Sequence, residues 1–204
     1  VDTFGGLRVI DVTDPAQPRT VGVTDTPGSA DDVFVLGSYA FMANGGDGLR
    51  VVSIANPLAP SEVGFYDTPG LAYGVVAIGD LAYVADGSSG LRIINVATPT
   101  APSQAGFYDT PDDARGLDVV DNRAYVADGD SGLQIINVSN PANPTLLGAK
   151  DTPFYGLGVA VAGTLAYVAD AGEGLRVIDV ANPASPNELG FFKTQEYAYA
   201  VFAV

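Results

Sequence analysis

Residues 81–96 read LAYVADGSSGLRIINV, and this stretch recurs, complete or in part, along the whole 204-residue chain. The Gly-Leu pair inside it returns every 42 residues without an insertion, at Gly6-Leu7, Gly48-Leu49, Gly90-Leu91, Gly132-Leu133 and Gly174-Leu175. A fixed period of this length is typical of proteins built from stacked structural repeats. The fold therefore depends on what one 42-residue unit forms.

One unit contains four short segments with the composition of strands, and each is followed by residues that break strands. In the second complete unit we expect strands over 72–78, 81–86, 91–96 and 103–109. Gly79-Asp80 separates the first two and suits the tight turn of a β-hairpin. A Gly- and Asp-rich loop precedes the third strand, and a loop with two prolines follows it, because proline donates no hydrogen bond to a sheet.

Four antiparallel strands in a repeat of about 40 residues are typical of a propeller blade. A β-solenoid is the alternative, but solenoid coils are usually shorter and contain fewer hairpins. We therefore predict an all-β fold, a β-propeller of 42-residue four-stranded blades, forming a single domain over residues 1–204. Leu91 opens the third strand of its unit, and we expect its side chain to be buried between blades. The four complete blades fall at about 30–68, 72–110, 114–152 and 156–194.

The two ends of the chain hold parts of a further unit. The N-terminal residues supply a third and a fourth strand, and the C-terminal AVFAV supplies a first strand. We expect them to form a split, incomplete fifth blade that lacks its second strand. The alternative is that the chain is a fragment of a larger propeller, which the absence of an initiator Met favours.

The third-strand blocks read LRVIDV from Leu7, LRVVSI from Leu49, LRIINV from Leu91, LQIINV from Leu133 and LRVIDV from Leu175. With AYVAD before the block and the double-proline loop after it, the pattern resembles the LVIVD repeat, and the resemblance covers essentially the whole chain. It implies a β-propeller of exported or surface-associated bacterial and archaeal proteins. It also implies no catalytic residues. We therefore expect an extracellular or cell-surface location.

Composition limits the classes of partner. The chain has 9 basic and 24 acidic residues, a net charge of -15, which repels nucleic-acid backbones. No apolar run approaches the roughly 18 residues that span a bilayer, so we expect no membrane insertion. The sequence contains no His and no Cys, which excludes disulfides, thiolate chemistry and the commonest general base.

The units differ most in the loop that enters the first strand. In repeat proteins the fixed positions build the stack, and varying loops on one face tend to bind. This loop and the Gly/Asp loop open on the same face of a propeller, where aromatic and Arg side chains are the usual interface anchors. The predicted partner-binding residues are Tyr73, Asp112, Asp113, Arg115, Phe154, Tyr155, Tyr197 and Tyr199.

Two groups of acidic residues have an ordinary structural interpretation. The segment from Asp128 to Gly132 begins like a calcium loop, but no bidentate Glu follows, and we predict turn chemistry with no metal and no cofactor. The repeated Asp-Thr-Pro elements are interpreted as turns that the Asp side chain stabilises. We predict a non-enzymatic binding or scaffold module for a protein or carbohydrate partner. The alternative is a glycan hydrolase or lyase that uses paired carboxylates. The oligomeric state is left open.

Overall fold

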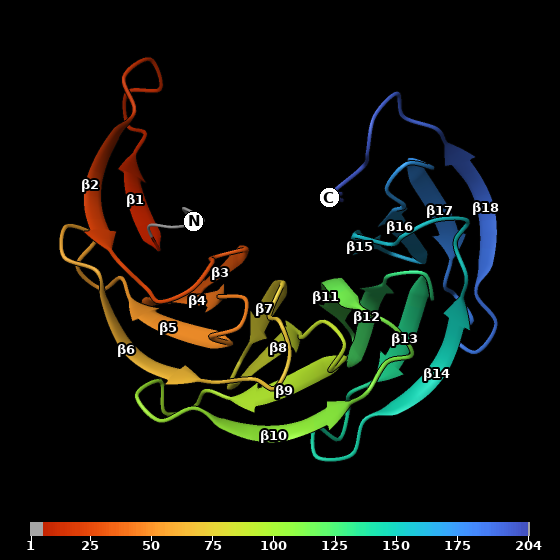
Figure 1. Ribbon diagram of the computed structural model, residues 1–204, viewed down its shortest axis with the longest axis horizontal. Helices are drawn as coiled ribbons and strands as arrows, with labels where there is room; N and C mark the ends of the chain where they lie inside the picture. Colours follow the sequence, from red (N-terminus) through yellow and green to blue (C-terminus); the bar gives the residue numbers. More distant parts are fainter. Residues whose placement is uncertain (1–5, 204) are drawn as a thin grey trace.

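The computed structural model describes residues 6–203 of the 204-residue chain. Over this range the secondary structure consists of β-strands, and none of the described residues lies in a helix. The strands form four antiparallel sheets of four strands and one sheet of two strands. Figure 1 shows these sheets following one another in chain order along an open arc.

The two-stranded sheet pairs β1 (Leu7–Asp11) with β2 (Arg19–Thr24). In each of the other sheets, four consecutive strands pair in sequence order, as expected for repeated hairpins. Their strands are β3 (Asp32–Leu36), β4 (Tyr39–Ala43), β5 (Leu49–Ser53) and β6 (Ser61–Tyr66); β7 (Gly74–Ile78), β8 (Leu81–Ala85), β9 (Leu91–Asn95) and β10 (Ser103–Tyr108); β11 (Ala114–Val120), β12 (Arg123–Asp128), β13 (Leu133–Asn137) and β14 (Thr145–Lys150); and β15 (Gly158–Ala162), β16 (Leu165–Ala169), β17 (Leu175–Asp179) and β18 (Asn187–Phe192).

The predicted strands of the second unit are confirmed to within two residues at either end. The hairpin turns between first and second strands use left-handed backbone, as their residues indicate. Gly79 has a φ of 57°, whereas Asp121 and Asn122 have φ values of 50° and 59°. A two-residue turn with positive φ at its first central residue, as at Gly79, is of one type, and a turn with positive φ at both central residues, as at Asp121 and Asn122, is of another. Both types suit the twist of the strands that they join.

The hydrophobic core lies between successive sheets and repeats with them. Leu91 and Ile93 are fully buried and cluster with Ile136 and Val138 of the following sheet. Leu91 is therefore buried between sheets, as predicted. On the other face of the same strand, Ile94 is also buried and packs against the preceding sheet. An interior third strand thus buries apolar side chains on both faces, because each interior sheet has a neighbour on either side.

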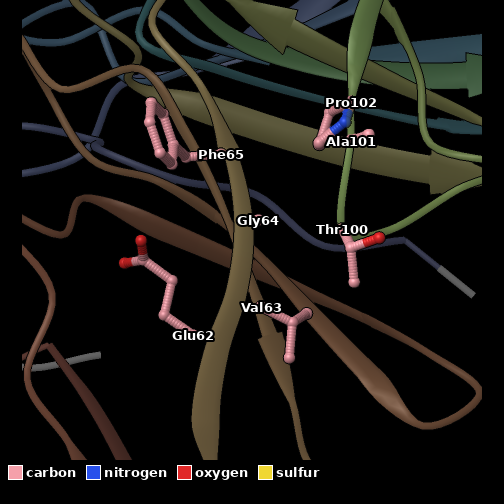
Figure 2. A pocket seen from close by; sticks show the side chains of 7 residues that line it. All are labelled: Glu62, Val63, Gly64, Phe65, Thr100, Ala101 and Pro102. Carbon is pink, nitrogen blue, oxygen red and sulfur yellow. The ribbon is translucent and has the colours of Figure 1, made fainter.

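A glycine in the fourth strand lets the next sheet approach closely. Gly64 of β6 lies beside the double-proline loop of the next unit, and a Cβ built there would lie under 3.0 Å from the carbonyl oxygen of Pro99. Figure 2 shows Gly64 on β6 and the loop that carries Thr100, Ala101 and Pro102 running beside it. The same close approach repeats at Gly22 with Pro57, Gly106 with Pro141, and Gly148 with Pro183.

The predicted split fifth sheet is wrong in its C-terminal part. β1 and β2 pair only with each other, and described residues 199–203 belong to no strand. Ala198 forms an isolated bridge with Ala171, equivalent to the bridges between neighbouring units such as Ala114 with Gly87, but the described residues after it continue into no strand. The predicted first strand lacks its second strand, and without that partner it has no neighbour with which to form a regular ladder. Residues 1–5 lie outside the described range.

No helix with the length and apolar character needed to cross a membrane is present in residues 6–203.

Candidate functional site

The variable loops are brought together at one end of the sheets. Each Gly/Asp loop pairs with the segment that enters the next sheet, through isolated bridges such as Gly87 with Ala114 and Gly129 with Gly156. These bridges are closed by backbone hydrogen bonds of 2.9 to 3.1 Å. Because the pairing uses backbone atoms, the side chains in these loops can vary without disturbing the stack.

A cavity of about 330 Å³ lies where the first strands of four sheets meet. Tyr73, Arg115, Leu157 and Tyr199 all contribute to its lining, as their equivalent positions in successive units predict. Asp31 and Asp32 from the first four-stranded sheet also line it. The cavity therefore combines aromatic rings, one guanidinium and two carboxylates.

Arg115, in the lining of this cavity, contacts several of the other predicted site residues. Its Nη2 lies 2.6 Å from an Asp113 carboxylate oxygen, and its guanidinium carbon lies 3.9 Å from the centre of the Tyr73 ring. The centre of the Tyr155 ring lies 5.6 Å from the same carbon, and the Tyr155 hydroxyl donates a 2.8 Å hydrogen bond to Asp113. Burial, and then this hydrogen bond, raise the pKa of the Tyr155 hydroxyl, which therefore stays protonated as a donor.

Three further predicted residues form an aromatic ladder, defined as Phe154, Tyr197 and Tyr199. The Phe154 and Tyr197 rings meet edge to face at 6.2 Å, and the Tyr197 and Tyr199 rings stack at 6.0 Å. All three side chains are exposed, Tyr199 at 71%. Aromatic pairs of this kind pack favourably, and here they also leave ring faces open to solvent.

Asp112 is the predicted site residue with a clear structural role. Its carboxylate accepts a 2.6 Å hydrogen bond from the Asp130 amide, and its own amide donates to Asp128 at 3.1 Å. The fully buried Asp128 carboxylate also accepts a 2.5 Å hydrogen bond from the Thr110 hydroxyl. The calcium-like loop is thus held by its own hydrogen bonds. In the described part of the chain no three acidic side chains gather as a metal site would require.

Two buried carboxyl groups at this end of the sheets have raised pKa values. Burial raises the pKa of Asp86 and of Asp128 above the ordinary Asp value. Asp86 has the Arg92 guanidinium 3.7 Å away, whereas the residue equivalent to Arg92 beside Asp128 is Gln134. Within the cavity, burial raises the pKa of Asp31, and the neighbouring charge of Asp32 acts in the same direction.

Substitution of Asp128 distinguishes hydrogen bonding from charge. Asp128→Asn is expected to stay within about 1 kcal/mol of the wild type at neutral pH. The reason is that Asn44 occupies the equivalent position, and its amide donates to the Thr26 hydroxyl at 2.8 Å. Asp128→Ala should cost about 2–4 kcal/mol, because the buried Thr110 hydroxyl and the partly buried Asp112 amide lose their acceptor. Urea denaturation measures both changes.

The stability of the wild type and that of Asp128→Asn should depend differently on pH. Since the folded state holds the Asp128 proton more tightly than the unfolded chain, wild-type stability falls as pH rises from the unfolded-state pKa to the raised folded-state pKa. Asp128→Asn has no such proton, so its stability relative to the wild type should increase as pH rises above about 4. Equal slopes of stability against pH for the two proteins would contradict this.

Sequence reasoning missed a buried arginine in the third strand. Arg50, Arg92 and Arg176 are each less than 9% exposed, and each guanidinium lies over a Phe of the fourth strand, at 4.5 to 4.8 Å. Arg50 and Arg92 also bind the Asp of the Asp-Thr-Pro element, Asp67 and Asp109, at 3.0 and 2.9 Å. Two of the four repeated Asp carboxylates therefore pair with arginine, a contact that their interpretation as turn formers did not include. The signal was the repeated LR dipeptide, which strand alternation alone assigns to solvent.

The LVIVD repeat model matches residues 1–26, 27–68, 69–110, 111–152 and 156–194. No curated protein matches the chain.

Among solved structures, the chain is similar to the computationally designed Ika8 protein, with a TM-score of 0.72 and 9% identity over 89% of this chain and 55% of that one. A functionally unknown protein from Desulfotomaculum acetoxidans DSM 771 has a TM-score of 0.72 and 19% identity over 95% and 65%. A chain of a nidogen–laminin complex has a TM-score of 0.66 and 18% identity over 91% and 72%. Such low identities indicate a shared fold alone. The chain spans 55% and 65% of the length of the first two.

Proposed function

The chain belongs to the LVIVD-repeat family, and on that premise we propose that it is a non-enzymatic binding module with propeller-like sheets. Its variable loops hold a carbohydrate or a protein segment, and it acts outside the cytoplasm or on a cell surface. The sheets serve as a rigid scaffold, and residues 1–204 act as one domain.

The aromatic ladder is the observation that supports this proposal. Three exposed rings gather on one surface although they come from loops about 42 residues apart, at Phe154 and at Tyr197 and Tyr199. Leaving aromatic faces in water is unfavourable unless a partner covers them. The open ring faces suit the apolar face of a sugar ring or an extended protein segment, and the Tyr hydroxyls can hydrogen-bond to it.

The charge around the ladder favours an uncharged or cationic partner. Arg115 is already engaged by Asp113 and by the Tyr73 ring, so it does not present a free cation. Asp31 and Asp32 add negative charge to the adjacent cavity. With a net charge of -15, the chain should also attract basic partners faster at low salt than at high salt.

A glycan array compares the wild type with a variant that carries Phe154→Ala, Tyr197→Ala and Tyr199→Ala. We expect the wild type to retain a subset of neutral glycans and the triple variant to lose them, with melting temperatures nearly equal because the three side chains are exposed. Leu58→Ala, an exposed apolar residue on a double-proline loop, is the matched control and should bind as the wild type does.

If no glycan is retained, the carbohydrate partner is excluded, and an array of basic peptides tests the protein segment with the same variants. Equal binding by the triple variant and the wild type on either array would contradict the proposed site. Unfolding of the triple variant would show instead that the ladder belongs to the core.

The second candidate is a carboxylate-based glycan hydrolase or lyase, and the perturbed carboxyl of Asp31 favours it. The pKa of Asp31 is raised by burial, as a general acid requires, and Asp31 lines the cavity beside Asp32. However, both Asp32 carboxylate oxygens accept backbone hydrogen bonds, from Val33 at 2.8 Å and Val75 at 2.9 Å. Asp31→Asn should abolish turnover of a retained glycan if this candidate is correct, whereas a binding site should keep most of its affinity.

A further inference from the structure

The first four-stranded sheet differs from the other three in the side chain that begins its Gly/Asp loop. Asn44 occupies the position that Asp86, Asp128 and Asp170 hold in the later units, and all four side chains are fully buried. Each Asp carboxylate accepts a backbone hydrogen bond from the loop that enters its own sheet. The amides that donate are those of Gly70, Asp112 and Phe154, at 2.9, 3.1 and 3.2 Å.

The loop that enters the first four-stranded sheet has a different backbone conformation. Here Nδ2 of Asn44 donates to the Thr26 hydroxyl at 2.8 Å and to the Pro27 carbonyl at 2.5 Å. A carbonyl therefore points at the side chain where the later units point an amide, so the peptide between Pro27 and Gly28 is reversed. Gly28 accordingly has a φ of 76°, in the left-handed region that favours glycine, whereas the equivalent Asp112 has no positive φ.

Two buried polar atoms of this unit have no hydrogen-bond partner among residues 6–203, namely Oδ1 of Asn44 and Nε of Arg50. In the last sheet, the equivalent Nε of Arg176 donates to an Asp170 carboxylate oxygen at 3.1 Å. A buried polar atom that forms no hydrogen bond is unfavourable. An aspartate at position 44 would offer acceptors to Arg50 Nε and to the Gly28 amide, as the carboxylates of the later units do.

The sequence contains a chemical route to that aspartate. Asn44 is followed by Gly45, and this is the only Asn-Gly pair in the chain. Because glycine has no side chain, its amide nitrogen can approach Cγ of the preceding Asn closely. Attack by this nitrogen closes a cyclic imide and releases ammonia, and water then opens the ring. Cleavage between Cγ and the nitrogen gives aspartate, whereas cleavage at the main-chain carbonyl gives isoaspartate, which has an additional backbone carbon.

The folded loop controls when this reaction can occur and which product it keeps. The Gly45 amide donates to the Ala72 carbonyl at 3.0 Å, and the Asn44 amide donates to the Gly48 carbonyl at 2.8 Å. The attacking nitrogen is thus held between two sheets, and the reaction requires the loop to open. Isoaspartate would lengthen the backbone between these two hydrogen bonds. Because both products can return to the imide, aspartate should accumulate in chains that fold.

We propose that Asn44 is a site of spontaneous deamidation, and that its conversion to aspartate reverses the peptide between Pro27 and Gly28. An oxygen in place of Nδ2 cannot donate to the Pro27 carbonyl, and at 2.5 Å the two oxygens repel each other. Rotation of the peptide points the Gly28 amide at the new carboxylate. The modification therefore changes the backbone of a variable loop and adds one negative charge beside Arg50.

Peptide mapping by mass spectrometry tests the modification, on the wild-type chain incubated at mildly alkaline pH with and without urea. We expect Asn44 to be converted to the acid in both samples, faster in urea, with aspartate as the main product in the folded sample. Asn95 is the internal control and should stay intact, because the β-branched Val96 that follows it hinders attack. An Asn44 that stays intact in urea, or isoaspartate as the main product in the folded sample, would overturn the proposal.

Asn44→Asp supplies the product directly and tests the change in the loop by amide hydrogen exchange of the ¹⁵N-labelled chain. We expect the Gly28 amide to exchange slower than in the wild type by about tenfold or more, because it gains a hydrogen bond to a carboxylate. The Gly70 amide, which already donates to Asp86, should exchange alike in both proteins. Unchanged exchange at Gly28, or an Asn44→Asp chain that does not fold, would contradict the proposal.

Discussion

Gly64→Ala should destabilise the fold by about 3 kcal/mol or more. The added methyl would lie under 3.0 Å from the Pro99 carbonyl oxygen, which belongs to the backbone of the next sheet. Relief therefore requires the double-proline loop, which runs beside β6 in Figure 2, to move away from that strand. The change in the free energy of unfolding is measured by urea denaturation.

Gly190→Ala is the matched control, because it makes the same substitution at the equivalent place in the last sheet. With nothing within 4 Å of its Cβ, we expect less than about 1 kcal/mol of destabilisation in dilute solution. Equal losses at Gly64 and Gly190 would mean that the cost comes from strand propensity and that close approach of the sheets contributes nothing.

Leu91→Ala is expected to cost about 2–5 kcal/mol, through lost burial and the cavity left between two sheets. Its side chain is fully buried among residues of both sheets, which are held by their own backbone ladders and so cannot collapse easily into the space.

Leu175→Ala provides the comparison for Leu91, since it removes the same leucine of the motif where no following sheet covers it. Leu175 is only partly buried, so its loss should cost clearly less. A wild-type denaturation curve for Leu91→Ala would contradict the placement of the core between the sheets. A larger loss at Leu175 than at Leu91 would contradict it as well.

The sequence was sufficient to predict the strands because each boundary is marked by a residue with a local conformational effect. Gly79 supplies a positive φ, and the prolines of the double-proline loop donate no hydrogen bond. The 42-residue register then placed Tyr73, Arg115 and Tyr199 on one cavity, because equivalent positions of stacked units must lie near one another. Because the units repeat, the position of a residue within its unit also predicts which residues of the other units lie near it.

The features that sequence reasoning missed depend on tertiary contacts. Arg92 sits on a strand position that alternation assigns to solvent, and it is buried because Asp109 and the Phe107 ring neutralise and cover it. The segment after Ala198 has the composition of a strand, but no second strand is available to it. Strand formation needs a partner, and composition alone does not supply one.

Fixed positions build the stack, and we propose that the variable loops hold a partner. The most direct test is a map of amide chemical shifts of the ¹⁵N-labelled chain, titrated with the glycan or peptide that the array retains. We expect the largest changes on residues 112–115, 154–157 and 196–199. Changes concentrated instead on the double-proline loops at the other end of the sheets, such as 56–60 and 98–102, would contradict it.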